Sequence, residues 1–433
     1  MKKILLVFIT AATFLLSGCG FSGFANIEDS LVPPTLSKNQ KEIYDVLKKS
    51  VGKNLKLKYP SSGDSRNAII MRDLDLDGTR EAIAFYQSTD LEASHNINIM
   101  ILSKKDGNWN IISELDGAGS DIDKVCFGNL GVKGSGFFAV GYNLTNRTDK
   151  QMVIYTYNGA SVIADRKHNY NRFEVMDIDE NGKDEILFLA NARKTNTPYA
   201  YVLSENQSGS FSIDSKAATN IEIYEYTKLA KGVLDDGRPA LYLDGKNADG
   251  LYITEILAVS DGKLENLLYS DKWLISNQTL RSSVAIEDVN GDDIYEIPQS
   301  YYLGDEEYSQ QKLTDWYDYK DDGFEKVMSS YVNPTDGFIF SFPEEWEYKV
   351  GVTKDEQTRQ TSFIVYDNGK NTGKTVLKII TMKKSEAQTQ PPADCSEIKS
   401  NGQLVYYAYI PPDVEKEYAL TLTQIKMNLI ITR

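Results

Sequence analysis

One short acidic pattern recurs along the middle of the chain and constrains its fold more than any other feature. It reads D-x-[DN]-x-[DN]-G-x-x-E and begins at Asp73, Asp177 and Asp288, each time between apolar, strand-like runs. In the third copy Asp293 stands where the other two have glycine. A pattern that returns in this way predicts a repeated structural unit in a radial or linear array.

Two eroded copies, which lack most of the carboxylates, lie between the complete ones, at 129–134 and 232–237. At the glycine position the five copies fall at residues 78, 134, 182, 237 and 293, a period near 54 residues. Each interval also holds alternating apolar residues and a hairpin turn such as Asp106-Gly107. Four strands per repeat of this length are typical of a propeller blade.

We therefore expect a mainly β fold, in which about five four-stranded repeats over residues 64–330 form a β-propeller-like array. The third repeat is expected to have strands near 171–176, 184–190, 198–204 and 210–214.

Different patterns flank the repeats. Before them, residues 37–63 are expected to form a helix and a lead-in strand, because Ser37 and Gln40 make a capping box and Gly52 ends the apolar helical face. After them, residues 331–433 are expected to form a small α+β domain. Its tail from Leu422 has helical spacing and then strand-like residues.

The N-terminus has the pattern of an export signal. Lys2 and Lys3 precede an apolar stretch of thirteen residues, Ile4–Leu16, which is too short to span a bilayer comfortably. The following Leu-Ser-Gly18-Cys19 resembles a bacterial lipobox. That resemblance implies cleavage between Gly18 and Cys19 and a diacylglyceryl anchor on the Cys19 thiol, since two acyl chains hold a protein on a membrane stably. An ordinary secretory signal with an incidental cysteine is the alternative.

This interpretation divides the N-terminal part into a signal peptide, residues 1–18, and a lipidated tether, residues 19–36. We expect the protein on the extracytoplasmic face of the bacterial cell membrane.

Composition excludes several classes of function. The 47 Lys and Arg residues against 62 Asp and Glu residues give a net charge of −15, which argues against a nucleic-acid partner. Two histidines are too few for a histidine-rich metal centre. Cys126 and Cys395, far apart in sequence, are expected to remain separate thiols.

Oxygen atoms at positions 1, 3, 5 and 9 of a tight loop suit a hard cation such as Ca²⁺. An EF-hand is excluded, because it requires flanking helices and a glutamate at position 12, where this chain has Ala84, Phe188 and Gln299. The alternative is that Asp, Asn and Gly are present because they favour turns.

The repeated loops resemble those of FG-GAP or VCBS-type repeats, found in integrin α-subunit propellers and in many bacterial surface proteins. The resemblance covers roughly residues 64–330 and implies that the loops bind structural Ca²⁺ at up to three sites. The implied ligands are Asp73, Asp75, Asp77 and Glu81, then Asp177, Asp179, Asn181 and Glu185, then Asp288, Asn290, Asp292 and Glu296. We expect Asp293 to strain the third loop, since glycine is missing there.

These features favour a non-enzymatic binding or scaffold lipoprotein with a protein or glycan ligand on the propeller face. The 27 tyrosines, dense at 301–302, 316–319 and 406–409, suit such a face or simply strand formation. Two alternatives stay open. One is a surface hydrolase or lyase that acts on polysaccharide through carboxylates, and the other is an envelope assembly factor with purely structural repeats.

Overall fold

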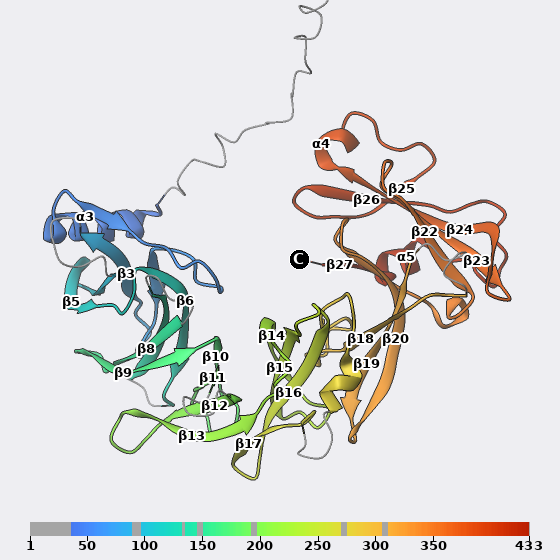
Figure 1. Cartoon of the computed structure of the whole chain (residues 1–433). Helices are drawn as coiled ribbons and strands as arrows, with labels where there is room; N and C mark the ends of the chain where they lie inside the picture. The colour runs from blue at the N-terminus through green and yellow to red at the C-terminus, as the bar shows by residue number, and fades with distance from the viewer. Residues whose placement is uncertain are drawn as a thin grey trace, which may run out of the picture.

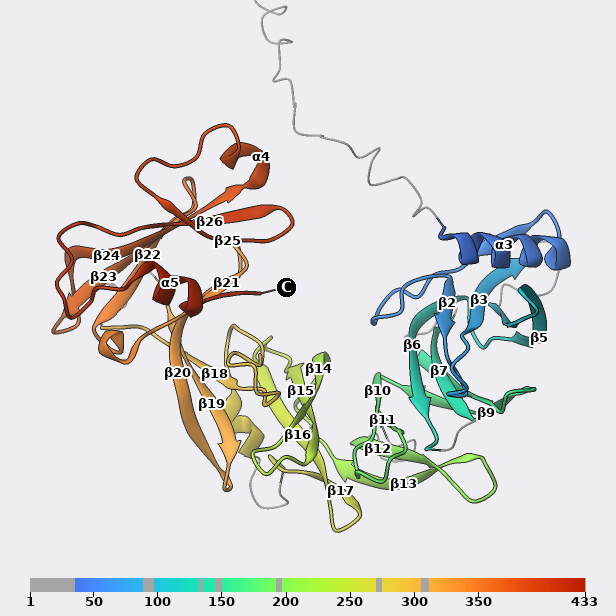
Figure 2. The same ribbon diagram turned by 180° about the vertical axis from the view of Figure 1, so that it is seen from behind.

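The computed structural model describes residues 36–88, 97–131, 135–144, 150–191, 197–269, 275–304 and 311–432. Strands take up 54% of the residues and helices 9%, which confirms the prediction of a mainly β fold. The strands form six antiparallel sheets of four or five strands. The sheets follow one another around an arc, which has α3 and the first sheet at one end and the C-terminal sheet at the other (Figures 1 and 2).

The first sheet follows a helix that begins where the sequence predicts. Helix α3 (Lys38–Val51) is capped by Ser37, whose hydroxyl accepts from the Gln40 N–H at 3.4 Å, and ends at Gly52. Ile43 and Leu47 on its apolar face are fully buried. The strands of the first sheet are β1 (Leu55–Leu57), β2 (Ile69–Arg72), β3 (Glu81–Ser88), β4 (Asn98–Lys105) and β5 (Asn108–Asp116).

The second, third and fourth sheets each have four strands in chain order. Those of the second are β6 (Asp121–Asn129), β7 (Gly136–Asn143), β8 (Lys150–Tyr157) and β9 (Val162–Tyr170). Those of the third are β10 (Arg172–Met176), β11 (Glu185–Asn191), β12 (Pro198–Glu205) and β13 (Phe211–Ala218), close to the predicted positions. Those of the fourth are β14 (Glu225–Val233), β15 (Pro239–Lys246), β16 (Tyr252–Ser260) and β17 (Lys263–Asn266).

The fifth sheet extends beyond the predicted repeat region. After the 3₁₀ helix η1 (Ile275–Thr279) its strands are β18 (Ile297–Tyr301), β19 (Leu313–Lys320), β20 (Gly323–Asn333), β21 (Phe338–Ser341) and β27 (Leu429–Ile431). The boundary that we placed after residue 330 therefore falls inside β20. Strands β21 and β27 both come from the C-terminal hundred residues, so the end of the chain returns to complete this sheet.

The sixth sheet lies at the C-terminal end of the arc (Figure 1). Its strands are β22 (Val350–Asp355), β23 (Gln360–Asp367), β24 (Lys370–Lys383), β25 (Ser396–Ser400) and β26 (Leu404–Tyr409). The same part of the chain forms the short helices η2 (Glu344–Trp346), α4 (Lys384–Ala387) and α5 (Leu422–Asn428). Helix α5 and β27 follow each other directly, so both patterns in the tail are used. One hydrophobic core, which includes Phe340, Trp346 and Phe363, joins the fifth and sixth sheets.

Ion pairs connect the inner sides of consecutive sheets. We call β2, β6, β10 and β14, the first repeat strands of the first four sheets, the inner strands; β10 packs against both β6 and β14. A cation on or before each inner strand pairs with an acid one sheet further along the chain. These pairs are Lys58–Asp121 at 2.5 Å, Lys124–Glu174, Arg172–Glu225 at 3.9 Å and Lys228–Glu287 at 2.6 Å.

Two of these lysines also bind the neighbouring backbone. Lys124 Nζ donates to the Phe173 carbonyl at 3.2 Å, and Lys228 Nζ donates to the Ile286 carbonyl at 2.7 Å. Each accepting carbonyl belongs to the residue just before the paired glutamate. The same polar link is therefore made twice, and it fixes the offset between neighbouring sheets.

A buried carboxylate on β16 makes stability depend on pH. Glu255 is fully buried and accepts from the Asn220 N–H at 2.7 Å, Asn266 Nδ2 at 2.6 Å and the Tyr226 hydroxyl at 3.0 Å. Burial raises the pKa of its carboxyl from 4.5 to about 7. The pKa of this carboxyl is higher in the folded state than in the unfolded state, so proton binding to Glu255 favours folding. Its contribution to the unfolding free energy is complete below pH 4.5 and is lost as the pH rises through about 7.

Between pH 4.5 and pH 8, we predict that the unfolding free energy of the unmodified protein falls by about 3 kcal/mol more than that of Glu255→Gln, as measured by urea unfolding. Glu265→Gln, an exposed neighbour on β17, is the matched control and should keep the wild-type pH profile. Superimposable profiles for Glu255→Gln and the wild type would contradict the assignment.

Candidate metal sites

The three complete acidic loops occupy equivalent places in their sheets. The first connects β2 to β3, and the second connects β10 to β11. The third precedes β18 and is closed by a single bridge between Glu287 and Glu296. Each loop therefore joins the inner position of a sheet to the next strand.

The first aspartate of each loop holds the turn together in the same way. Its two oxygens accept from the main-chain N–H groups of loop positions 5 and 6. The distances are 3.2 and 3.0 Å for Asp73, 3.1 and 2.9 Å for Asp177, and 3.2 and 3.2 Å for Asp288. With this geometry, carboxylates of positions 1, 3 and 9 lie close together in the first two loops, and those of positions 1, 5 and 9 in the third.

Left-handed backbone at two positions makes the turn possible. Position 4 has a φ of 57° at Leu76, 59° at Glu180 and 84° at Gly291. Position 6 has a φ of 94° at Gly78, 83° at Gly182 and 66° at Asp293. The third loop keeps the conformation although its glycine has moved from position 6 to position 4, and Asp293 takes the left-handed conformation that glycine would adopt more easily.

The glutamate at position 9 is buried in all three loops. Glu81, Glu185 and Glu296 are 3%, 2% and 0% exposed. Each accepts from the main-chain N–H of loop position 2, at 3.0, 3.2 and 2.9 Å respectively. Burial is the largest cause of a raised pKa in these groups, and the negative charge of nearby carboxylates adds to it. Together they raise the pKa to about 7 for Glu81, 8 for Glu185 and 8 for Glu296.

Three carboxylates converge in each loop. In each of three sets, one oxygen per residue lies within 4.8 Å of the others. The sets are Asp73, Asp75 and Glu81, then Asp177, Asp179 and Glu185, then Asp288, Asp292 and Glu296. Nine of the twelve residues predicted as ligands therefore gather in three compact clusters.

The other three predicted ligands border these clusters. Asp77 Oδ1 accepts from the Thr79 N–H at 2.6 Å, and Asn181 Oδ1 accepts from the Lys183 N–H at 2.8 Å. Asn290 Oδ1 accepts from the Asp292 N–H at 3.0 Å. Each of these side chains lies in its loop and supports the turn through one oxygen.

The donor set fits a hard divalent cation. All the converging atoms are carboxylate oxygens, which Ca²⁺ prefers. Moreover, Glu296 Oε1 is buried and has no hydrogen-bond partner among the described residues. A buried polar atom without a partner is costly, and a bound cation would satisfy it.

Sequence patterns did not identify Asp318, which belongs to the surroundings of the third loop. Its Oδ1 is also buried without a hydrogen-bond partner in the described part of the chain. Burial is the largest cause and the negative charge of Asp292 the next; they raise the pKa of this carboxyl to about 6. Asp318 lies on β19, outside the repeated motif. The sequence signal nearest to it is the tyrosine-rich stretch at 316–319.

The eroded loops dock onto the complete ones. Asp184 Oδ2 accepts from the N–H and the Nδ2 of Asn129 at 2.7 and 2.8 Å, and the Asp184 N–H donates to the Asn129 carbonyl at 3.0 Å. In the fourth sheet the Val233 N–H donates to the Asp293 carbonyl at 2.9 Å. Complete loops therefore contact the loops of neighbouring sheets.

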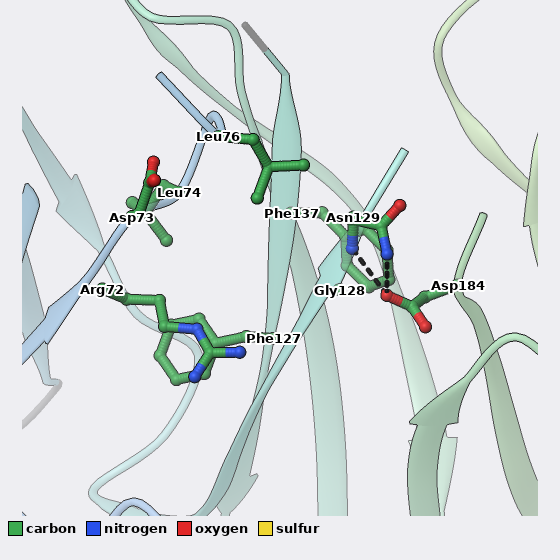
Figure 3. Close-up of a pocket in the computed structure, with 9 residues that line it drawn as sticks. All are labelled: Arg72, Asp73, Leu74, Leu76, Phe127, Gly128, Asn129, Phe137 and Asp184. Carbon is green, nitrogen blue, oxygen red and sulfur yellow. Dashed lines mark hydrogen bonds between the residues drawn. The ribbon is translucent and has the colours of Figure 1, made fainter. Parts of the chain in front are cut away.

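A small cavity lies between the first complete loop, the first eroded loop and the second complete loop. Figure 3 shows Asp73 on one side of it, Asn129 bound to Asp184 on the other, and the Arg72 guanidinium against the Phe127 ring, 5.5 Å from its centroid. The cavity has a volume of about 160 Å³. This is smaller than most small-molecule sites, so we assign it no organic ligand.

Some expectations concern parts of the chain outside the described residues. Gly18 and Cys19, with the whole signal peptide and most of the tether, belong to this group. Within the described part of the chain, no helix has both the length and the apolar character needed to cross a bilayer.

Comparison with known proteins identifies no family. No family model matches the chain, and no curated protein matches it. Among solved structures it is similar to a rhamnogalacturonan lyase from Bacillus licheniformis, with 11% identity, a TM-score of 0.33, and coverage of 85% of this chain and 93% of that one. It is also similar to Sqt1 from Chaetomium thermophilum, with 10% identity, a TM-score of 0.35, and coverage of 83% and 99%. At these scores neither likeness carries a functional argument.

Proposed function

We propose that this protein is a lipid-anchored, extracytoplasmic binding or scaffold protein whose five repeats form a β-propeller-like array supported by Ca²⁺. One observation carries the proposal: three loops of the same hydrogen-bonded geometry each gather three carboxylates, one of which is a buried glutamate. Turn formation alone does not require a buried acid at position 9, so it accounts for the loops less well.

The proposed role of the ions is structural. The ligands would come from positions 1, 3, 5 and 9 of each loop, and the ion would supply positive charge where burial has raised the pKa of Glu81, Glu185 and Glu296. Since the complete loops also contact neighbouring sheets through Asp184 and Asp293, holding them in shape would stabilise the array as a whole. The binding partner would then use a rigid surface.

One pair of carboxylates outside the loops is a candidate catalytic pair, but its contacts do not favour an enzyme. Asp315 and Glu347 both contact Lys326, at 3.3 and 2.8 Å. Both carboxylates are therefore ion-paired with the same lysine, whereas a glycosidase needs one protonated and one free carboxylate facing a substrate. We therefore do not propose a catalytic role for these residues.

We predict that millimolar Ca²⁺ raises the melting temperature by several degrees over the value in chelator. Three sites at ten times their Kd contribute about 4 kcal/mol. Replacing Asp73, Asp177 and Asp288 together by Ala should abolish the Ca²⁺-dependent shift. Asp261→Asn, at the tip of the β16–β17 hairpin, is the control and should keep it. The absence of a shift in the unmodified protein would mean that the loops are turns only.

The anchor is tested separately. We predict that Cys19→Ser moves the protein from the membrane fraction to the soluble fraction and abolishes its labelling by a fatty-acid analogue, because the thiol would carry the lipid. Cys126→Ser, which replaces a partly buried cysteine on β6, should leave both unchanged. Membrane association that survives Cys19→Ser would disprove lipid anchoring at this residue.

A further inference from the structure

The fifth sheet lacks the inner strand that the first four sheets have. Strand β2 pairs with β3 through four residues, β10 with β11 through five, and β6 and β14 with their neighbours through eight each. In the fifth sheet only Glu287 pairs with Glu296, and β18 is left as an edge strand.

Pro298 explains why this ladder stops after one rung. The Glu296 N–H donates to the Glu287 carbonyl at 3.0 Å, and the Glu287 N–H donates to the Glu296 carbonyl at 3.4 Å. Because main-chain groups alternate in direction along a strand, those of residues 298 and 300 face the same open side. Residue 298 is a proline and has no N–H to donate, so the next rung is missing.

A buried arginine holds the departing chain away from β18. Arg281 makes two 2.6 Å contacts with the Asp244 carboxylate, and both residues are buried. Asp244 also accepts from the Ile286 N–H at 2.8 Å. The segment 281–286 is therefore tied to the fourth sheet, although by its place in the repeat it would pair with β18.

The same arginine maintains a strained residue. Val284 has a φ of 68°, which is unusual for a β-branched side chain, and its carbonyl accepts from Arg281 Nε at 2.8 Å. Such strain is concentrated at ligand sites and switch regions. Val284 also lines a cavity beside β18.

The cavity beside β18 has a volume of about 450 Å³. This volume falls in the range of ligand sites. The cavity is lined by apolar residues that include Val284, Trp316 and Ile339, and by the polar residues Ser300 and Thr314. In the third sheet, Phe173 and Val175 of the inner strand are buried between neighbouring sheets. At the same places in the fifth repeat, Ile286 is fully buried, whereas Val284 is only partly buried and lines the cavity.

We propose that the open edge of β18 and this cavity bind an extended peptide segment of a partner protein, with apolar residues at alternate positions. The peptide would stand where the inner strand stands in the other sheets. The main-chain N–H and C=O of Ser300 would pair with it, and its apolar side chains would enter the cavity. Lys312, which also lines the cavity, favours an acidic residue in the peptide.

This inference rests on the proposed binding role but not on Ca²⁺. The test uses the purified full chain and the capped pentapeptide acetyl-Arg-Phe-Glu-Val-Met-amide, which is the sequence of β10. We expect saturating peptide to slow hydrogen exchange at the Ser300 N–H about tenfold. The control peptide acetyl-Arg-Asp-Glu-Asp-Met-amide lacks the alternating apolar residues and should have no effect. The assay is repeated in chelator, where a loss of Ca²⁺ would leave peptide protection intact.

A variant locates the site. Ala285→Trp places a large side chain in the cavity and should abolish protection, whereas Ile163→Trp, at a position 63% exposed on β9, should not. Equal protection by both peptides, no protection by either, or protection by a neutral oligosaccharide in place of the peptide would overturn the proposal. The comparison of the two peptides on the unmodified protein decides the question even if Ala285→Trp does not fold.

Discussion

The burial of one glutamate at the end of each complete loop is the constraint on which the rest of this architecture depends. Glu81, Glu185 and Glu296 lie at or just before the start of the second strand of their sheets and accept the N–H of loop position 2. A carboxylate almost removed from water needs a proton or a nearby positive charge. The loop supplies more negative charge instead, so the arrangement is stable with the glutamate protonated or with a cation among the carboxylates. In the second alternative, which we propose, the aspartates that accompany the glutamate in every complete loop would be further ligands of the cation.

The complete and eroded loops alternate along the arc, and this alternation distributes the effect of three clusters over five sheets. The second sheet is bound to the third by Asp184, and the fourth is bound to the fifth by Asp293. On the inner side, the lysine–glutamate pairs repeat a second set of connections. The fifth sheet departs from the pattern, since Pro298 and the Arg281–Asp244 pair leave its inner position open. Because the inner position of the fifth sheet has a single bridge in place of a strand, we propose that a partner binds there.

Local chemistry was predictable from the sequence, whereas contacts between repeats were not. The capping box at Ser37, the turn at Asp106-Gly107 and the strands of the third repeat depend on neighbouring residues, and they appear as expected. So do the acidic clusters, because their members lie within nine residues of one another. The Lys124–Glu174 pair spans fifty residues, and Asp318 reaches the third loop from another strand, so neither leaves a local pattern. The end of the fifth sheet was missed because β27 joins it from the far end of the chain.

The central claim is that each complete loop holds one cation, and the number of Ca²⁺ ions bound per chain tests it most directly. Equilibrium dialysis of the full chain against ⁴⁵Ca²⁺ in the millimolar range expected for extracellular sites counts them. The account predicts three ions per chain for the unmodified protein. It predicts two after Glu81→Gln, Glu185→Gln or Glu296→Gln, each of which removes the buried carboxylate of a single cluster. Binding of no Ca²⁺, or a count of three that none of these substitutions lowers, would contradict it.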